Sequence, residues 1–217
     1  MRIRAFSGGA FGQNGYLAVC ESDGAVVVID PGAAASGMVR HLQSAGTKPT
    51  AILLTHAHLD HIEGIGEIRA AFPTVPIHLH PADRPLYDLA SQQGEAFGHP
   101  MPELPPPDHE LTAGERITFG TCAFEVRHAP GHSPGHVILY ASEAGLALVG
   151  DVVFAGSIGR SDLPGGDFRT LIDSIRREVL SLPPQTKLFS GHGPETTVDV
   201  EARHNPFLIP HYRGEFA

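Results

Sequence analysis

The chain of 217 residues carries a formal net charge of −9, which argues against nucleic acid as a partner, because phosphate binding depends on clustered Lys and Arg. It has no apolar run near the roughly 20 residues of a membrane span and no apolar signal segment after Met1. We therefore expect one cytoplasmic domain over residues 1–217 with no membrane partner, and its fourteen histidines, almost as many as its Lys and Arg together, indicate metal chemistry.

The first half of the chain is predicted to alternate strands and helices. Its hydrophobic pattern indicates strands over residues 16–20, 25–29, 51–55 and 75–79, and helices over 37–45, 61–72 and 82–92. Ser36 is expected to cap the first of these helices. Five prolines make residues 94–109 an irregular loop, which would be either a lid over a site or a plain surface connector.

The second half is predicted to begin with four closely spaced strands, over residues 115–119, 122–127, 136–141 and 146–149. Asp167 is expected to cap a helix over 168–179, and a last strand follows over 187–190. The tail over 203–217 is expected to be irregular. Cys20 and Cys122 belong to no CxxC motif, and we interpret them as buried thiols outside any disulfide framework.

The most informative stretch is THAHLDH at residues 55–61, which directly follows a predicted buried strand. It brings together His56, His58, Asp60 and His61. Such a density of polar side chains after a buried strand requires partners, because Asp almost never buries unpaired. A bound metal would supply them, since neutral imidazole and carboxylate are both good ligands for Zn²⁺ and similar ions.

Three further candidate ligands, His132, Asp151 and His192, also follow predicted strands. Sites in sheet-based folds gather in the loops along one edge of the strands. The glycines at 131, 150, 191 and 193 would let the backbone turn sharply there. Together with the first stretch, these residues make seven ligands, which is enough for two metal ions.

The seven residues resemble the ligand set of the metallo-β-lactamase fold superfamily in its two-metal form, along essentially the whole chain. The resemblance implies an α/β (α+β) fold, a four-layer αβ/βα sandwich of two mixed sheets flanked by helices. It implies that the ligands of metal one are His56, His58 and His132, that those of metal two are Asp60, His61 and His192, and that Asp151 bridges both. The lactamases proper usually carry another residue at the position of His61, which argues against antibiotic hydrolysis.

Other segments resemble the glyoxalase II group of this superfamily. Residues 156–167 (GSIGRSDLPGGD) carry that likeness, and residues 191–197 and 205–208 are similar to its short bacterial branch. The group hydrolyses hydroxyacyl thioesters of glutathione, such as S-D-lactoylglutathione, so the resemblance implies a small-molecule thioester substrate. The basic C-terminal glutathione contacts of the long form are not expected here, and Pro194 stands about where that form has a glutathione-contacting tyrosine.

The expected reaction is attack of a metal-bridging hydroxide on the thioester carbonyl, because metal coordination lowers the pKa of water from about 15.7 toward about 7. Asp60 is the candidate catalytic residue that both binds metal and orients this hydroxide. Two zinc ions are the first expectation, although iron and manganese accept the same ligands. Arg160 is the candidate for binding a substrate carboxylate, and the alternative is a salt bridge to Asp162 or Asp167.

Several alternatives stay open at this point. Persulfide dioxygenase, an oxidoreductase of the same superfamily, uses one iron on the positions matching His56, His132 and Asp151, and lactonase or phosphodiesterase chemistry is also compatible. A non-catalytic structural zinc module is disfavoured, because such sites are closed and usually rich in cysteine. His78 and His80 are expected to face solvent or the surroundings of the site. His136 and Asp30 are candidates for supporting the ligands, with a turn role as the alternative for Asp30. The sequence carries no prediction of oligomeric state.

Overall fold

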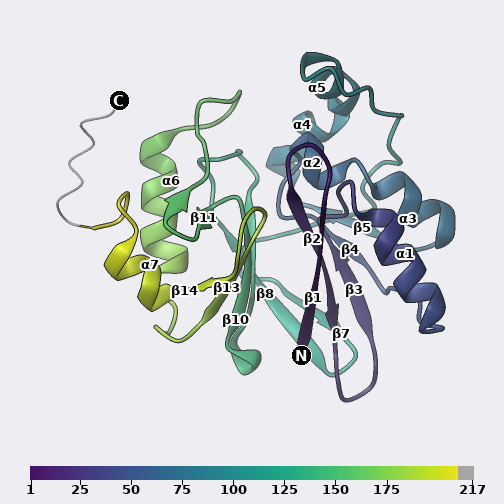
Figure 1. Cartoon of the computed structure of the whole chain (residues 1–217), viewed down its shortest axis with the longest axis horizontal. Coiled ribbons are helices and arrows are strands. Elements are labelled where there is room, and N and C mark those ends of the chain that lie inside the picture. Colours follow the sequence, from purple (N-terminus) through teal and green to yellow (C-terminus); the bar gives the residue numbers. More distant parts are fainter. Residues whose placement is uncertain (210–217) are drawn as a thin grey trace.

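The computed structural model describes residues 1–209. Two six-stranded sheets face each other in the middle of the molecule, and helices cover the outer face of each sheet (Figure 1). This arrangement confirms the predicted α/β sandwich of two mixed sheets flanked by helices. The end of the expected irregular tail, residues 210–217, lies outside the described residues.

The first sheet is built from the N-terminal half of the chain. Its strands lie in sequence order, with the first three antiparallel and the last four parallel to one another. They are β1 (Arg2–Gly8), β2 (Gln13–Val19), β3 (Val26–Ile29), β4 (Ile52–Leu53), β5 (Ile77–Leu79) and β6 (His109–Glu110). The helices on this side are α1 (Ala35–Ser44), α2 (Leu59–Ile62), α3 (Ile65–Ala71), the 3-10 helix η1 (Pro81–Asp83), α4 (Arg84–Asp88) and α5 (Ala90–Ala96).

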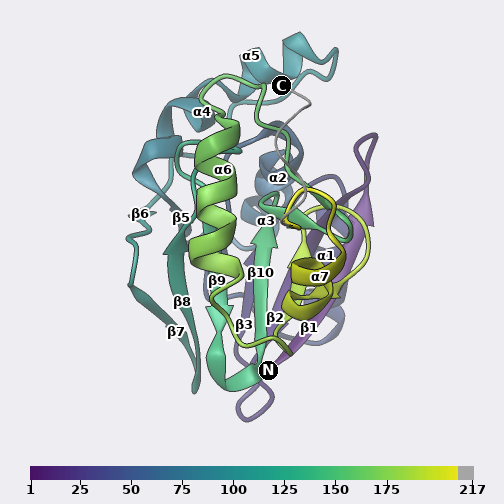
Figure 2. The same cartoon turned by 90° about the vertical axis from the view of Figure 1, so that its left-hand side faces the viewer.

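The second sheet comes from the C-terminal half, and all its neighbouring strands are antiparallel except β10 and β13. In spatial order its strands are β14 (Thr196–Thr197), β13 (Lys187–Ser190), β10 (Leu146–Gly150), β9 (Val137–Ala141), β8 (Cys122–His128) and β7 (Arg116–Phe119). The 3-10 helix η2 (Ser142–Ala144) connects β9 to β10. A small hairpin of β11 (Val153–Phe154) and β12 (Ser157–Ile158) follows β10. Helix α6 (Phe168–Ser174), its π-helical continuation η3 (Ile175–Val179) and α7 (Val198–His204) lie on the outer face (Figure 2).

Strand β3 shows how the layers form. Its four residues are all buried, but they alternate between two separate hydrophobic cores. Val26 and Val28 pack in the core beneath α1 and α3, whereas Val27 and Ile29 pack in the core between the two sheets. Successive side chains of a strand point to opposite faces. A continuous apolar run therefore serves a sheet that is covered on both sides.

The core between the sheets is expected to dominate stability. Leu53 on β4 is fully buried in it, so Leu53→Ala should lower the free energy of unfolding by about 3 kcal/mol through lost burial and a residual cavity. Urea unfolding followed by circular dichroism measures the difference. Leu89→Ala is the matched control, because Leu89 is 44% exposed and its truncation should cost less than about 0.5 kcal/mol. Equal losses in both variants would contradict this assignment of the core.

Most predicted elements are present, but the helix expected over residues 61–72 is divided into α2 and α3 near Gly64. The cause is a close approach of another loop. Gly64 donates its N–H to the carbonyl oxygen of Pro31 at 2.8 Å, and a Cβ at this position would lie 2.6 Å from the same oxygen. The tight packing of the β3–α1 loop against this point therefore requires glycine.

The helix caps divide between confirmation and correction. Asp167 caps α6 as predicted, since its carboxylate accepts the N–H of Thr170 at 2.7 Å. Ser36 is not the cap of α1, because the N-cap position is Ala34. The tail expected to be irregular from residue 203 is still helical at its start, because α7 extends to His204. Neither α7 nor β1 was predicted from the sequence.

The prediction of free thiols was wrong. Cys20, which follows β2, and Cys122, which begins β8, form a disulfide that joins the two sheets. The two cysteines are 102 positions apart, so no local pattern relates them. The bond lies at the edge of the sandwich where β8 begins, whereas the loop that carries His132 lies where β8 ends. Over residues 1–209, none of the helices has the length and apolar character needed to cross a membrane.

Candidate metal centre

The seven predicted ligands meet at one edge of the sandwich. The stretch from His56 to His61 follows β4, whereas His132, Asp151 and His192 follow β8, β10 and β13. The first group therefore comes from the first sheet and the second group from the other sheet. We call these seven residues the His/Asp cluster; its members are His56, His58, Asp60, His61, His132, Asp151 and His192.

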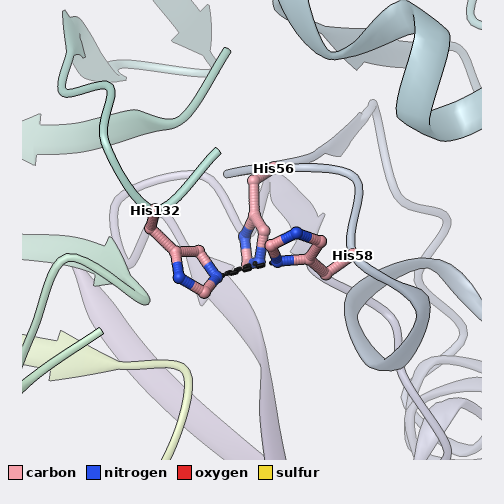
Figure 3. A group of neighbouring side chains, drawn as sticks. All are labelled: His56, His58 and His132. Atoms are coloured by element: carbon pink, nitrogen blue, oxygen red, sulfur yellow. Dashed lines mark hydrogen bonds between the residues drawn. The ribbon is translucent and has the colours of Figure 1, made fainter. Parts of the chain in front are cut away.

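One triad of the cluster consists of His56, His58 and His132, whose ring nitrogens point toward one another (Figure 3). The Nε2 atom of His132 lies 2.8 Å from Nδ1 of His58 and 3.2 Å from Nε2 of His56. All three rings are buried. Burial lowers the pKa of each ring, to about 3 for His58, so that neutral imidazoles with free lone pairs are favoured.

The second triad consists of Asp60, His61 and His192. The Nε2 atom of His192 lies 3.2 Å from the Asp60 carboxylate, and that of His61 lies 3.9 Å from it. Burial opposes protonation of both rings, but the neighbouring carboxylates outweigh it: the pKa of His61 is raised well above its usual value, and that of His192 is raised to about 9. A cation bound here would take the place of these protons.

Asp151 lies between the two triads and faces both. Its Oδ1 atom lies 3.3 Å from Nε2 of His61, and its Oδ2 atom lies 3.5 Å from Nε2 of both His132 and His192. Burial would raise the pKa of this carboxyl group, but the surrounding imidazoles, His61 first, hold it well below its usual value. Asp151 therefore presents a charged carboxylate that is in contact with histidines of both triads.

The donor set fits divalent metal ions. Among the described residues, Nε2 of His61 and Oδ1 of Asp151 are buried and have no hydrogen-bond partner, although they lie only 3.3 Å apart. Leaving such atoms unpaired costs free energy, and a shared cation would satisfy both. A third possible ligand group combines Asp30 with His56 and His61. Both oxygens of Asp30 already accept hydrogen bonds, so this residue fits a supporting role better.

Asp30 fixes the orientation of His61. Its two oxygens accept the N–H and the hydroxyl of Thr55 at 2.7 and 2.6 Å, and Oδ2 also lies 3.0 Å from Nδ1 of His61. Nε2 of His61 is thereby left to face Asp60 and Asp151. Asp30 has a positive φ of 45°, a conformation that Asp tolerates better than most residues do. The contact with His61 is the one expected of a supporting partner, whereas Asp30 itself lies before the turn that begins at Ala33.

His136 supports the cluster through the backbone. It is fully buried, stacks on His56 with ring centroids 4.7 Å apart, and accepts the N–H of Asp151 on Nε2 at 3.0 Å. Gly191 is equally constrained, because a Cβ there would collide with Oδ1 of Asp151 and lie 2.6 Å from Cε1 of His61. The close packing of the ligands therefore depends on a glycine directly before His192.

Arg160 lies beside the cluster but its guanidinium is engaged elsewhere. The side chain is exposed and forms a two-pronged ion pair with Asp162, at 2.7 and 2.8 Å, which matches one of the alternatives drawn from the sequence. Its backbone carbonyl lies 2.7 Å from Nδ1 of His132 and so orients that ring. Recognition of a substrate carboxylate by Arg160 would require the ion pair to open.

The remaining histidines singled out in the sequence lie apart from the cluster. His78 pairs with His109 at 4.8 Å between ring centroids, and His80 stacks on His128 at 4.3 Å. Their rings are partly exposed, as expected. The loop over residues 94–109 begins within α5 and is otherwise irregular up to β6, with His99 paired to Glu63 at 2.6 Å.

Three supporting residues were not predicted. Asn14 donates to the carbonyl oxygens of Ser190 and Gly193, at 3.1 and 2.8 Å, and so holds both sides of the His192 turn. Gln93 donates to the carbonyl oxygen of Ala57 at 3.0 Å. Asp83 accepts hydrogen bonds from two of the ligand loops. Each acts from a distant part of the chain, and the only sequence signal is a polar residue beside a predicted element.

Comparison with known proteins places this geometry in a family. A family model described as the metallo-beta-lactamase superfamily matches residues 8–192. The hydroxyacylglutathione hydrolase GloC of Haemophilus influenzae is 35% identical, over 96% of this chain and 98% of that protein. The B3 metallo-β-lactamase BLEG-1 is similar in structure, with a TM-score of 0.88 and 39% identity over 95% of this chain and 99% of that one. TTHA1623 in a di-iron-bound form has a TM-score of 0.87 and 44% identity over 94% and 100% of the two chains. The chain therefore belongs to the metallo-β-lactamase superfamily.

Proposed function

We propose that this protein is a metal-dependent thioester hydrolase that holds two divalent cations in the His/Asp cluster. His56, His58 and His132 would bind one cation, and Asp60, His61 and His192 the other, with Asp151 as the ligand they share. The observation that carries the proposal is the position of Asp151, whose carboxylate lies within 3.5 Å of His132 in the first triad and of His61 and His192 in the second. A single-metal site has no use for that arrangement.

The protein side chains prepare this centre for hydrolysis. When bound, two divalent cations supply a hydroxide nucleophile at neutral pH and polarise the substrate carbonyl. Burial keeps the rings of His56, His58 and His132 neutral, so that their lone pairs are available. Asp30 and the carbonyl of Arg160 fix the rings of His61 and His132 through the nitrogen that faces away from the site. This support reduces the reorganisation that metal binding requires.

Asp60 is assigned two roles, as a ligand and as the group that orients the nucleophile. Asp60→Ala is therefore expected to lower the metal content below two per chain and to lower kcat/KM by about 10²- to 10³-fold, the range typical of losing a positioned acid–base or charge-stabilising group. Metal analysis and thioester kinetics on the same preparation measure both effects. A variant that kept two metals and full turnover would exclude both roles.

The proposed substrate is a hydroxyacyl thioester of glutathione, of the S-D-lactoylglutathione type. Support comes from the likeness to the GloC hydrolase, which spans nearly both chains. It also comes from Arg160, whose backbone contacts His132. The guanidinium of Arg160 would suit a substrate carboxylate once its ion pair with Asp162 opens. The thiolate released from a thioester is a good leaving group. The site therefore does not require a strong general acid.

Hydrolysis of β-lactams is the second candidate, because BLEG-1 is 39% identical over almost the whole chain. The metals are proposed to be zinc, with iron as the alternative supported by the di-iron form of TTHA1623. A persulfide dioxygenase would use a single iron and would leave the second triad without a role.

Metal analysis of the purified protein, combined with three activity assays, tests these assignments. We expect two metals per chain and turnover of S-D-lactoylglutathione well above that of a chromogenic cephalosporin. Oxygen consumption on glutathione persulfide with one iron per chain would support the dioxygenase instead. Faster turnover of the cephalosporin would support the lactamase.

A further inference from the structure

Asp83 is a buried carboxylate outside the His/Asp cluster. It ends the 3-10 helix η1, directly after β5, and has no exposed surface. Its Oδ2 atom accepts the N–H of Ala57 at 3.0 Å and the hydroxyl of Ser133 at 2.7 Å, while Oδ1 accepts the N–H of Gly135 at 2.5 Å. The carboxylate therefore accepts hydrogen bonds from two different loops, and each of its oxygens acts as an acceptor.

Each of these donors is the chain neighbour of a histidine in the site. Ala57 lies between His56 and His58, Ser133 follows His132, and Gly135 precedes His136. The first donor belongs to the loop after β4, in the first sheet, and the other two belong to the loop between β8 and β9, in the second sheet. One carboxylate thus links the two ligand loops at the points where they carry their imidazoles.

We propose that Asp83 is a positioning residue that sets the spacing of the first metal triad. The distances that matter cross between the two loops: Nε2 of His132 lies 2.8 Å from Nδ1 of His58 and 3.2 Å from Nε2 of His56. A change in loop separation would alter both distances together. This inference rests on the proposed function, because it requires that the triad binds a metal ion.

A backbone hydrogen bond also links these loops, at the residue before His56 and the residue after His136. Val137 donates its N–H to the carbonyl oxygen of Thr55 at 2.8 Å and so joins the ends of β4 and β9. That bond lies on the strand side of both loops. Asp83 acts within the turns themselves, and its three donors would be left unpaired in a buried place without it.

Gly135 shows how closely the carboxylate is fitted. A Cβ at this position would lie 2.5 Å from the backbone nitrogen of Asp83 and 2.9 Å from both its Cβ and its Cγ. Only glycine therefore allows the loop between β8 and β9 to reach the carboxylate. Gly135→Ala would displace Asp83 while the carboxylate itself remains, which makes it an independent variant for testing.

The experiment compares the wild-type protein with Asp83→Asn and Gly135→Ala. An amide keeps the shape of the side chain but turns one acceptor into a donor that faces N–H groups. The affinity of the first site for Zn²⁺, measured by competition with a chelating dye, is expected to fall about 10- to 100-fold in both variants, as for other groups that orient ligands. The absorption bands of Co²⁺ bound at this site should also shift, because they report ligand geometry.

Glu201→Gln is the matched control. Glu201 is an equally buried carboxylate with three donors, Gly156 N at 2.9 Å, Thr196 Oγ1 at 2.6 Å and Asn205 Nδ2 at 2.8 Å, none of which neighbours a site histidine in the chain. Glu201→Gln should lower the melting temperature about as much as Asp83→Asn does, whereas the Zn²⁺ affinity and the Co²⁺ spectrum should stay as in the wild type.

The results distinguish the role of Asp83 from the proposed metal-dependent function. Unchanged affinity and spectrum in Asp83→Asn and Gly135→Ala, beside a wild-type protein that binds metal, would overturn the role of Asp83 and leave the proposed function intact. A wild-type protein that binds neither Zn²⁺ nor Co²⁺ would overturn both. If Asp83→Asn fails to fold, Gly135→Ala decides by the same two measurements.

Discussion

Replacing Asp151 with asparagine is expected to convert a two-metal protein into one that holds at most one metal per chain. Asparagine has nearly the same shape, but only one of its two terminal atoms can act as a ligand, so one triad loses its contact. The change also removes a buried negative charge that offsets the cations. We expect kcat/KM to fall by at least about 10³-fold, which corresponds to roughly 4 kcal/mol of lost transition-state stabilisation.

Metal analysis and thioester kinetics on the same sample measure this prediction. The fold should survive, because the N–H of residue 151 would still bond to His136, and circular dichroism tests that. Asp199→Asn removes the same charge from an exposed ion pair with Arg203 and should change neither metal content nor turnover. An Asp151→Asn protein with two metals and wild-type turnover would show that the cluster does not share this ligand.

The strands and the positions of the candidate ligands after them could be predicted from short-range patterns, whereas the four-layer sandwich and the division of the ligands between two metals were implied by the resemblance to the superfamily. Buried strands read as apolar runs, and the loops that follow them at one edge carry the polar residues. His56 to His61 lie within six positions, so their grouping needed no knowledge of the fold. His132, Asp151 and His192 were grouped with them because each follows a predicted strand and because the seven residues together resemble the ligand set of the superfamily.

The sequence offered Asp30 and His136 as supporting residues, but it gave no indication of Asn14 or Asp83, because their contacts span long stretches of sequence. Asn14 bonds to Gly193 across 179 positions, and Asp83 bonds to Gly135 across 52. The break between α2 and α3 has the same origin, since it comes from the approach of Pro31 to Gly64. A pattern of hydrophobic residues carries no information on such pairs. Strand β1 was missed for another reason, because all seven of its residues are exposed or only half-buried.

Reduction of the Cys20–Cys122 disulfide is expected to lower the free energy of unfolding by about 4 kcal/mol, because the bond closes a loop of 102 positions and restricts the unfolded chain. For a domain of this size that corresponds to a fall in melting temperature of roughly 10 °C. Thermal unfolding with and without a phosphine reductant measures it. The folded geometry should persist, since the N–H of Thr121 still bonds to Asp23 at 2.8 Å across the same two turns.

The Cys20→Ser/Cys122→Ser variant is the control: it should match the reduced wild type and show no response to reductant. Two titratable thiols in folded protein purified without reductant would contradict the bond. Disulfides are uncommon in reducing compartments, so this titration also bears on the expected cytoplasmic location.

The disulfide and the His/Asp cluster join the same two sheets at opposite ends. Strand β8 runs from Cys122 to His128, about 20 Å of extended chain, before the loop that carries His132. Constraints this far apart, with no shared partner, should contribute independently to stability. Metal binding should therefore raise the melting temperature by a similar amount in the oxidised and the reduced protein. A metal effect that appeared only in the oxidised form would instead mean that the disulfide holds the sheets in the register that the ligands need.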